Sequence, residues 1–157
     1  MTTVEWPYNL PIWRCFFRAI SPDGRYIAQV DPAYEVSMGN PTSGTLCLSV
    51  GLHIERCNPS LLWSEDSRYL VVPQFFHRFG LRRQRLLIVA VQERYVLAST
   101  EFAHYFQPES FTDSQLVVIK NPFRSPCHLQ FTIPGDLGSR FKPMHAAWPQ
   151  GTDASRS

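Results

Sequence analysis

This sequence lacks the features that mark an exported or membrane-inserted chain. No stretch is apolar over the length needed to span a bilayer, and the most apolar run, Leu86 to Val91, has the length of a strand. Met1 to Trp13 contains no basic segment followed by an apolar run and a cleavage site, so we expect no secretory signal. No paired spacing such as C-x-x-C occurs, which favours buried, reduced thiols in the four cysteines: Cys15, Cys47, Cys57 and Cys127. These absences predict a cytoplasmic protein without a membrane partner.

Strong charge is also missing. The formal net charge is +2 and charged residues make up 18% of the chain, which is too little to argue from overall charge for nucleic acid or a membrane surface. Hydrophobic residues at 44% and aromatic residues at 13% are instead typical of a packed globular protein. A chain of 157 residues suits one domain. We expect that domain over residues 1–148 and a disordered tail of small polar residues over 149–157.

The motifs of common catalytic and cofactor sites are absent as well. There is no G-x-S-x-G, no Gly-rich phosphate loop and no H-E-x-x-H, and the five histidines are scattered singly. Cys127 and His128 are neighbours, but adjacent side chains on a strand point to opposite faces, which argues against a shared metal or a catalytic pair. We therefore expect no enzyme activity, no metal site and no cofactor.

The sequence does contain a repeated segment. Residues 18–28 read RAISPDGRYIA, and residues 61–71 match them as LLWSEDSRYLV. A weaker third copy at 109–118, ESFTDSQLVV, has one residue fewer before its aspartate and Leu116 where the others have tyrosine. Spacings of 43 and 47 residues separate the three aspartates, and such a period suits four short strands with their turns: Asp23, Asp66 and Asp113.

Each copy is typical of a tight hairpin, in which an apolar strand enters, the aspartate caps the turn and an alternating strand leaves. The adjacent Glu65 and Asp66 could also form an acid–base pair, but the turn position of Asp66 favours capping. Trp63 and Phe111 align with Ile20 ahead of the turn and are predicted to lie in the core. Helical periodicity is weak, so the further elements are predicted as strands: 45–50, 53–57, 84–91, 95–99 and 128–133.

These copies resemble the blades of β-propellers of the WD-repeat and TolB-like kind, which open on a hydrophobic residue, Ser-Pro-Asp-Gly and a basic-aromatic-aliphatic strand. The resemblance covers residues 14 to 133 and implies an all-β fold of about three four-stranded antiparallel repeats, at 14–58, 59–105 and 106–134. Propellers of this kind close with about four to eight blades. Three blades therefore imply an open or partial propeller-like array, a repacked sandwich, or closure with a second copy or a partner.

One segment combines charge with aromatic residues. Between Phe75 and Arg85 the chain has four arginines and three phenylalanines, a mixture suited to a protein-binding hot spot or to stacking on single-stranded nucleic acid. The plain alternative is a long hairpin loop with solvated charges. A second long loop, 31–41, lies at the equivalent place in the first copy, where an ordinary exposed loop is the alternative. The predicted partner-binding residues are Phe76, Arg78, Phe79, Arg82, Arg83 and Arg85, with Tyr34 and Glu35 from the second loop.

These observations favour a non-catalytic module that binds another protein, one with an acidic surface. An inhibitor or immunity-type protein that neutralises a toxin or an enzyme by covering it is the specific role we predict, by analogy with how repeat folds are used. The alternative is a nucleic-acid-binding protein that uses the same basic aromatic segment. Self-association is a further option, because an open array leaves strand edges unpaired. Hydrolase or transferase activity would need convergent polar residues that the sequence does not show.

Overall fold

The computed structural model describes residues 17–31, 34–35, 41–144 and 148. The described part of the chain contains no helix, and every strand pairing in it is antiparallel, which confirms the all-β prediction. The strands form one sheet of ten strands and one of three. The predicted disordered tail, 149–157, lies outside the described residues.

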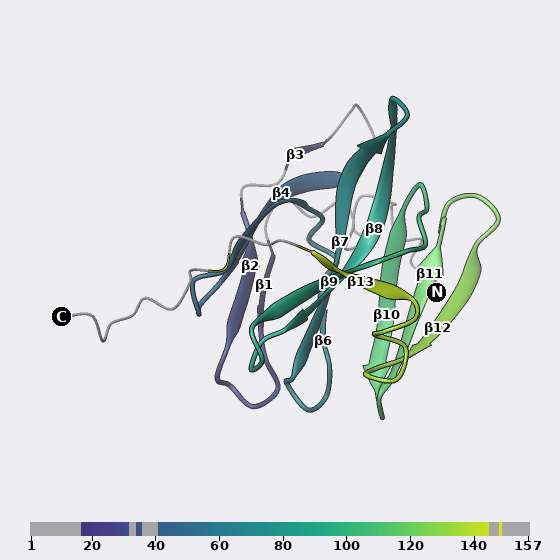
Figure 1. Cartoon of the computed structure of the whole chain (residues 1–157). Coiled ribbons are helices and arrows are strands. Elements are labelled where there is room, and N and C mark those ends of the chain that lie inside the picture. The colour runs from purple at the N-terminus through teal and green to yellow at the C-terminus, as the bar shows by residue number, and fades with distance from the viewer. Residues whose placement is uncertain (1–16, 32–33, 36–40, 145–147, 149–157) are drawn as a thin grey trace, which may run out of the picture.

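The first layer of the fold is the part of the large sheet built from the first repeat (Figure 1). Its strands are β1 (Phe17–Ile20), β2 (Ile27–Val30), β3 (Tyr34–Glu35), β4 (Thr42–Leu48) and β5 (His53–Cys57). A single residue pair, Cys57 with Gln74, joins this layer to the next. The first two repeats therefore share one continuous hydrogen-bonded sheet.

The second layer holds the longest strands. Its members are β6 (Leu62–Trp63), β7 (Tyr69–Arg78), β8 (Leu81–Ala90), β9 (Tyr95–Ser99) and β13 (Phe141–Met144). β9 has the predicted bounds, whereas β8 begins three residues earlier than expected and β13 has no counterpart in the repeat pattern. β13 lies beside β9, with Phe141 opposite Ser99 and Met144 opposite Val96.

The third layer is a separate three-stranded sheet, drawn in green in Figure 1: β10 (Phe106–Thr112), β11 (Gln115–Lys120) and β12 (Cys127–Thr132). We expected four strands in each repeat, and the described part of the third repeat has three. The chain leaves β12 and returns to the second layer as β13 instead of adding a strand to β12.

Two hydrophobic cores separate the three layers. Because side chains alternate along a strand, Leu70 and Val72 of β7 enter the core shared with the first layer, while Tyr69 and Val71 enter the core shared with the third. Both faces of the middle layer are thus buried, which explains why 86–91 is a continuous apolar run.

The first two hairpin turns confirm the predicted capping role of Asp23 and Asp66, whereas in the third no such bond to the carboxylate of Asp113 forms among the described residues. In the first turn the hydroxyl of Ser21 donates to the carboxylate of Asp23 over 2.8 Å, and the amide of Arg25 donates to the same oxygen over 3.0 Å. The second turn repeats both bonds at Ser64 and Asp66, at 2.6 and 3.1 Å. Asp66 is therefore a turn cap in the same way as Asp23.

Among the described residues there is no helix with the length and apolarity that crossing a bilayer requires. The thiols of Cys47, Cys57 and Cys127 are free. The prediction of burial for all four cysteines holds for Cys57, whereas Cys47 is only partly buried and Cys127 is exposed at the start of β12. Cys15 lies outside the described residues.

Candidate functional site

The connection between β7 and β8 differs from the sequence expectation. The sequence allows a long loop between Phe75 and Arg85, but the two strands stay paired up to Arg78 and Leu81. Only Phe79 and Gly80 form the turn, and their φ angles are 52° and 74°. Two residues with positive φ give a hairpin turn whose twist matches that of the flanking strands, so the pairing continues to the tip.

Strand alternation divides the side chains of this hairpin between two faces. One face continues the side that covers the first core, and it carries Phe76, Arg78, Arg83 and Arg85. Arg82 lies on the opposite face, and Phe79 lies in the turn. Four of the six hairpin residues predicted to bind a partner thus share one face.

The tip of the hairpin is apolar and open to solvent. Phe79 is 89% exposed and Leu81 is 54% exposed. In Figure 1 the β7–β8 hairpin projects beyond the neighbouring strands, so both residues stand at its outer end. A large exposed aromatic side chain at such a place is suited to insertion into a partner's surface.

Aromatic rings contact two of the three arginines on the face that carries Phe76. The guanidinium of Arg85 lies 5.4 Å from the centre of the Phe76 ring, and that of Arg78 lies 4.8 Å from the centre of the Phe102 ring. The two rings contact each other, with centroids 4.9 Å apart. Cation–π contacts of this kind restrict the orientation of a guanidinium and leave its donors available at the edge.

Phe102 reaches this face because the chain after β9 is fastened to β8. The amide and carbonyl groups of Gln84 and Ala103 form a two-bond bridge, at 2.7 and 3.1 Å. The buried Gln84 side chain then accepts a hydrogen bond of 2.6 Å from the amide of Phe106. The segment that carries Phe102 is thereby held against the strand that carries Arg85.

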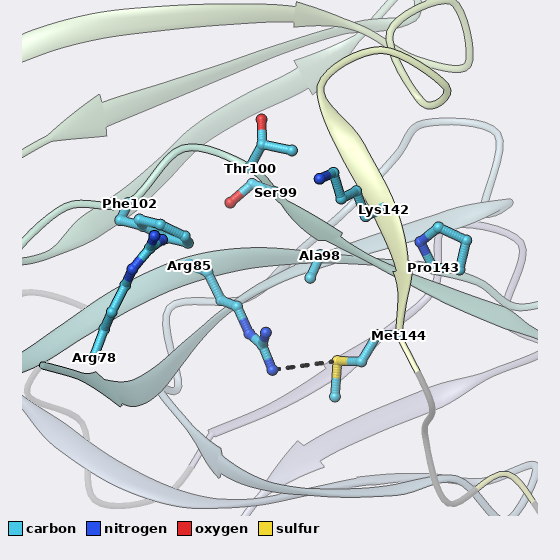
Figure 2. Close-up of a pocket in the computed structure, with 9 residues that line it drawn as sticks. All are labelled: Arg78, Arg85, Ala98, Ser99, Thr100, Phe102, Lys142, Pro143 and Met144. Carbon is cyan, nitrogen blue, oxygen red and sulfur yellow. Dashed lines mark hydrogen bonds between the residues drawn. The ribbon is translucent and has the colours of Figure 1, made fainter.

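A pocket of about 300 Å³ lies beside this arginine face. Figure 2 shows Arg78 and Phe102 on one side of it, Lys142 and Pro143 on the other, and the guanidinium of Arg85 between them, reaching toward Met144. The lining comes from neighbouring strands, with Ala98, Ser99 and Thr100 completing it. Lys142 and Met144 belong to β13, which pairs with β9.

Arg85 is the most enclosed cation of the pocket. Its Nε donates to Oε1 of Gln74 over 2.9 Å, and its Nη2 points at Sδ of Met144 over 3.7 Å. Burial lowers the pKa of Arg85 from its ordinary value, and the positive charge of Arg56 lowers it further. The guanidinium thus occupies a position where its charge is disfavoured and not balanced by a carboxylate among its described contacts.

The other cations of the hairpin also lack a carboxylate partner among the described residues. The ion pairs among the described residues are Arg68 with Glu93, Lys120 with Glu101, His128 with Glu109, and Arg140 with Glu101 and Asp136. None of these pairs includes a hairpin arginine or Lys142. Positive charge is therefore concentrated on the hairpin although the chain as a whole is nearly neutral.

Tyr34 and Glu35 do not belong to the β7–β8 hairpin. They form β3, whose backbone pairs with Ser43 and Thr42 of β4. The structure thus places the six predicted hairpin residues on one hairpin, four of them on one face, and leaves these two on a separate two-residue strand.

Sequence reasoning missed seven of the nine pocket residues, among them Phe102, Lys142 and Met144. Phe102 follows β9 without any motif, and the other two belong to the strand that the repeat pattern does not contain. The signal that could have suggested β13 is the apolar Phe141 after a cluster of turn residues, which by itself is weak.

Groups suited to catalysis or metal binding are few in the described part of the chain. No three His, Cys, Asp or Glu side chains there are placed to bind a metal ion. Sγ of Cys47 lies 3.3 Å from Nδ1 of His53, but burial raises the pKa of the Cys47 thiol, so it is in its weakly nucleophilic form. Cys127 and His128 are both exposed, and their contact is a long one from Sγ to the His128 carbonyl.

Comparison with known proteins yields no match to this chain: no family model matches, and neither the curated proteins nor the solved structures include a significant match.

Proposed function

We propose that this protein is a non-catalytic module that binds another protein through its β7–β8 hairpin. The observation that carries this proposal is the tip, where Phe79 is 89% exposed and has a φ angle of 52°. A positive φ is rare and unfavourable for a bulky residue, and exposure of an aromatic ring is unfavourable as well. Two unfavourable features at one residue support a role in binding, because neither stabilises the fold.

The proposed partner has an acidic surface. Arg78, Arg82, Arg83 and Arg85 form no ion pair within the described part of the chain, so their charges are free to meet carboxylates of a partner. Arginine suits this purpose because its planar donors bind carboxylates in pairs. Aromatic and arginine side chains together are also the types enriched at interface hot spots.

We further propose that the fold is an open, propeller-like array of three repeats. Contacts between successive hairpin turns support it: the amide of Asp23 donates to Oγ of Ser67 over 2.8 Å, and the amide of Asp113 donates to Oε2 of Glu65 over 3.1 Å. Each turn thus contacts the turn of the next repeat. An array of this kind presents its longer hairpins at one edge for binding.

The finer role we propose is that of an inhibitor or immunity-type protein in the cytoplasm. The projecting hairpin supports it, because a narrow element with an aromatic tip can enter a cleft of a toxin or an enzyme (Figure 1). The free thiols of Cys47, Cys57 and Cys127 fit a reducing compartment. The test is whether equimolar protein abolishes the activity of the captured partner.

The experiment that tests protein binding is capture from native lysate with the tagged chain, at low and high salt and after nuclease treatment. The variant Arg82→Glu/Arg83→Glu is compared with Arg25→Glu/Arg94→Glu, which makes the same change in charge at exposed arginines in other turns. We expect one stoichiometric protein with the wild type and the control, and none with the hairpin variant at unchanged melting temperature. Equal capture by both variants would contradict the proposal.

Nucleic acid is the second candidate, and the presence of four arginines and three phenylalanines in the hairpin favours it. It predicts that the captured material is sensitive to nuclease and that the affinity falls steeply with salt, because binding releases counterions from phosphates. Recovery of nucleic acid alone would replace the protein-binding proposal by this one.

A further inference from the structure

The pocket beside the hairpin has the chemistry of an anion site. We propose that it binds a single oxyanion group, a carboxylate or a phosphate, between Arg85, Arg78 and Lys142. This inference rests on the proposed function and deepens it, because it assigns the most specific contact with an acidic partner to the base of the hairpin and not to its tip. The three cations line one hollow of about 300 Å³ and come from three strands, β7, β8 and β13.

The positive charge of the pocket has no carboxylate partner among the described residues. Arg78, Arg85 and Lys142 belong to none of the ion pairs among the described residues. The nearest acidic residue in sequence to the lining, Glu101, already pairs with Lys120 at 3.4 Å and Arg140 at 3.3 Å. An anion that enters the pocket would therefore meet three positive charges that line it and have no carboxylate partner.

Arg85 is held in a fixed orientation that suits this ligand. The ring of Phe76 lies against its guanidinium, and Gln74 accepts its Nε–H. Gln74 is itself buried and is oriented by a second bond of 3.0 Å, from its Nε2 to the carbonyl of Glu55. Because Nε is already bonded, the Nη groups remain to receive the ligand.

The contact of Arg85 with Met144 also points to an absent acceptor. Its Nη2 lies 3.7 Å from Sδ of Met144, and a thioether sulfur is a weak acceptor for a charged donor. A carboxylate or phosphate oxygen would make a shorter, charge-assisted bond with the same donor. The half-buried guanidinium thus has a weak partner where a strong one would fit.

The size of the pocket limits what it can hold. Pockets for drug-sized ligands run from about 300 to 1,000 Å³, and this one is at the lower end of that range. Phe102 and Pro143 supply apolar walls on opposite sides in Figure 2. These walls suit one charged group on a short chain, such as an acidic side chain, a chain-terminal carboxylate or a phosphoryl group.

The test uses the purified full chain and two small probes, inorganic phosphate and glutarate, titrated at low salt and followed by NMR signals of Ala98, Ser99 and the Arg85 side chain. The uncharged glutaramide is the control ligand. We expect saturable shifts with at least one anion and none with glutaramide. A preference for phosphate assigns the site to phosphoryl groups, and a preference for glutarate assigns it to carboxylates. Absence of saturation with both anions would overturn the proposal.

Variants locate the binding in the pocket. We expect Arg85→Gln and Lys142→Gln each to weaken binding about tenfold, since each removes a charge-assisted contact. Lys142 is exposed, so its substitution keeps the fold even if that of Arg85 does not. Arg25→Gln, at an exposed arginine in the turn between β1 and β2, is the matched control and should leave the affinity unchanged. Equal weakening by Arg25→Gln would show only a general effect of charge and would overturn the assignment.

The outcome is independent of the partner-binding test. If the small anions bind but the hairpin variants still capture the partner, the anion site is confirmed and the proposed role of the hairpin in partner binding is wrong. If the hairpin variants lose the partner but neither anion binds, the role of the hairpin is supported and the anion site is wrong.

Discussion

The ring of Tyr26 is stacked on the ring of Trp63, with centroids 6.1 Å apart and planes 18° from parallel. Tyr69 and Phe111 repeat this arrangement, at 6.4 Å and 10°. Each stack joins the tyrosine after one hairpin turn to the aromatic residue before the next turn. In the first repeat, Ile20 occupies the position that Trp63 has in the second. No tyrosine from a preceding repeat stacks on Ile20 in the described chain, and its side chain is 57% exposed. The exposure of this position therefore depends on whether a neighbouring repeat covers it.

The first prediction concerns this difference between equivalent positions. Trp63→Ala should lower the free energy of unfolding by about 3–5 kcal/mol, because it removes a buried aromatic side chain and its stack. The substitution also removes the hydrogen bond that Nε1 of Trp63 donates to the carbonyl oxygen of Ala19. Ile20→Ala, at the same place in the first repeat, should change the free energy of unfolding by less than about 0.5 kcal/mol. Urea unfolding followed by far-UV circular dichroism measures both, and equal losses would show that the stacks do not set the stability.

A second prediction concerns the hydroxyl of Tyr69, which is buried without a hydrogen-bond partner. Tyr69→Phe should raise the free energy of unfolding by about 1 kcal/mol at pH 7, because it removes an unsatisfied polar group and keeps the stack. Tyr26→Phe is the matched control, since its hydroxyl is not among the buried unpartnered atoms. A loss of stability in Tyr69→Phe would mean that the hydroxyl has a partner in solution.

The same variant should change the response to alkali. Burial raises the pKa of Tyr69 above the ordinary 10.0, so the folded state favours the neutral phenol. The resulting stability is present below pH 10 and is lost as the pH rises through the higher folded pKa. Between pH 9 and pH 11, unfolding curves of the wild type should therefore fall more steeply than those of Tyr69→Phe. Parallel curves would contradict this assignment.

A third prediction concerns acid. The amide of Arg25, the hydroxyl of Ser21 and other donors hold the pKa of Asp23 below the ordinary 3.8, the amide of Arg25 most strongly. The stability from this carboxylate is present above the unfolded pKa and is lost as the pH falls through the lower folded value. Asp23→Asn should thus unfold with a flatter dependence on pH between about 5 and 2 than the wild type. Asp113→Asn, at a turn where no such bond to the carboxylate forms, is expected to follow the wild type.

The repeat pattern predicted much of the fold because the turns are local. The Ser-x-Asp turns and the strands His53–Cys57 and Tyr95–Ser99 follow from residues that contact their sequence neighbours. The missing residue in the third copy likewise matches its two-residue turn at Asp113 and Ser114.

The pocket could not be predicted in this way, because it depends on pairings between distant segments. Lys142 lines the same pocket as Arg85 only because β13 returns to β9 after the third repeat, and nothing local in 141–144 specifies that neighbour. The paired length of the β7–β8 hairpin was also missed, since Phe79-Gly80 lacks the Asn-Gly or Asp-Gly pair that usually marks such a turn.

Phe79 itself gives the last prediction, in which stability and binding change in opposite directions. Asparagine accepts a positive φ far more readily than phenylalanine and is common before glycine in such turns, so Phe79→Asn should stabilise the fold by about 1 kcal/mol. The same substitution removes the exposed ring, and capture of the partner should fall about tenfold or more. Phe79→Tyr keeps an aromatic ring in the same unfavourable turn, so we expect it to bind without any gain in stability. If Phe79→Asn is more stable and still captures the partner fully, the ring has no part in binding, and the strain at the tip must have another cause.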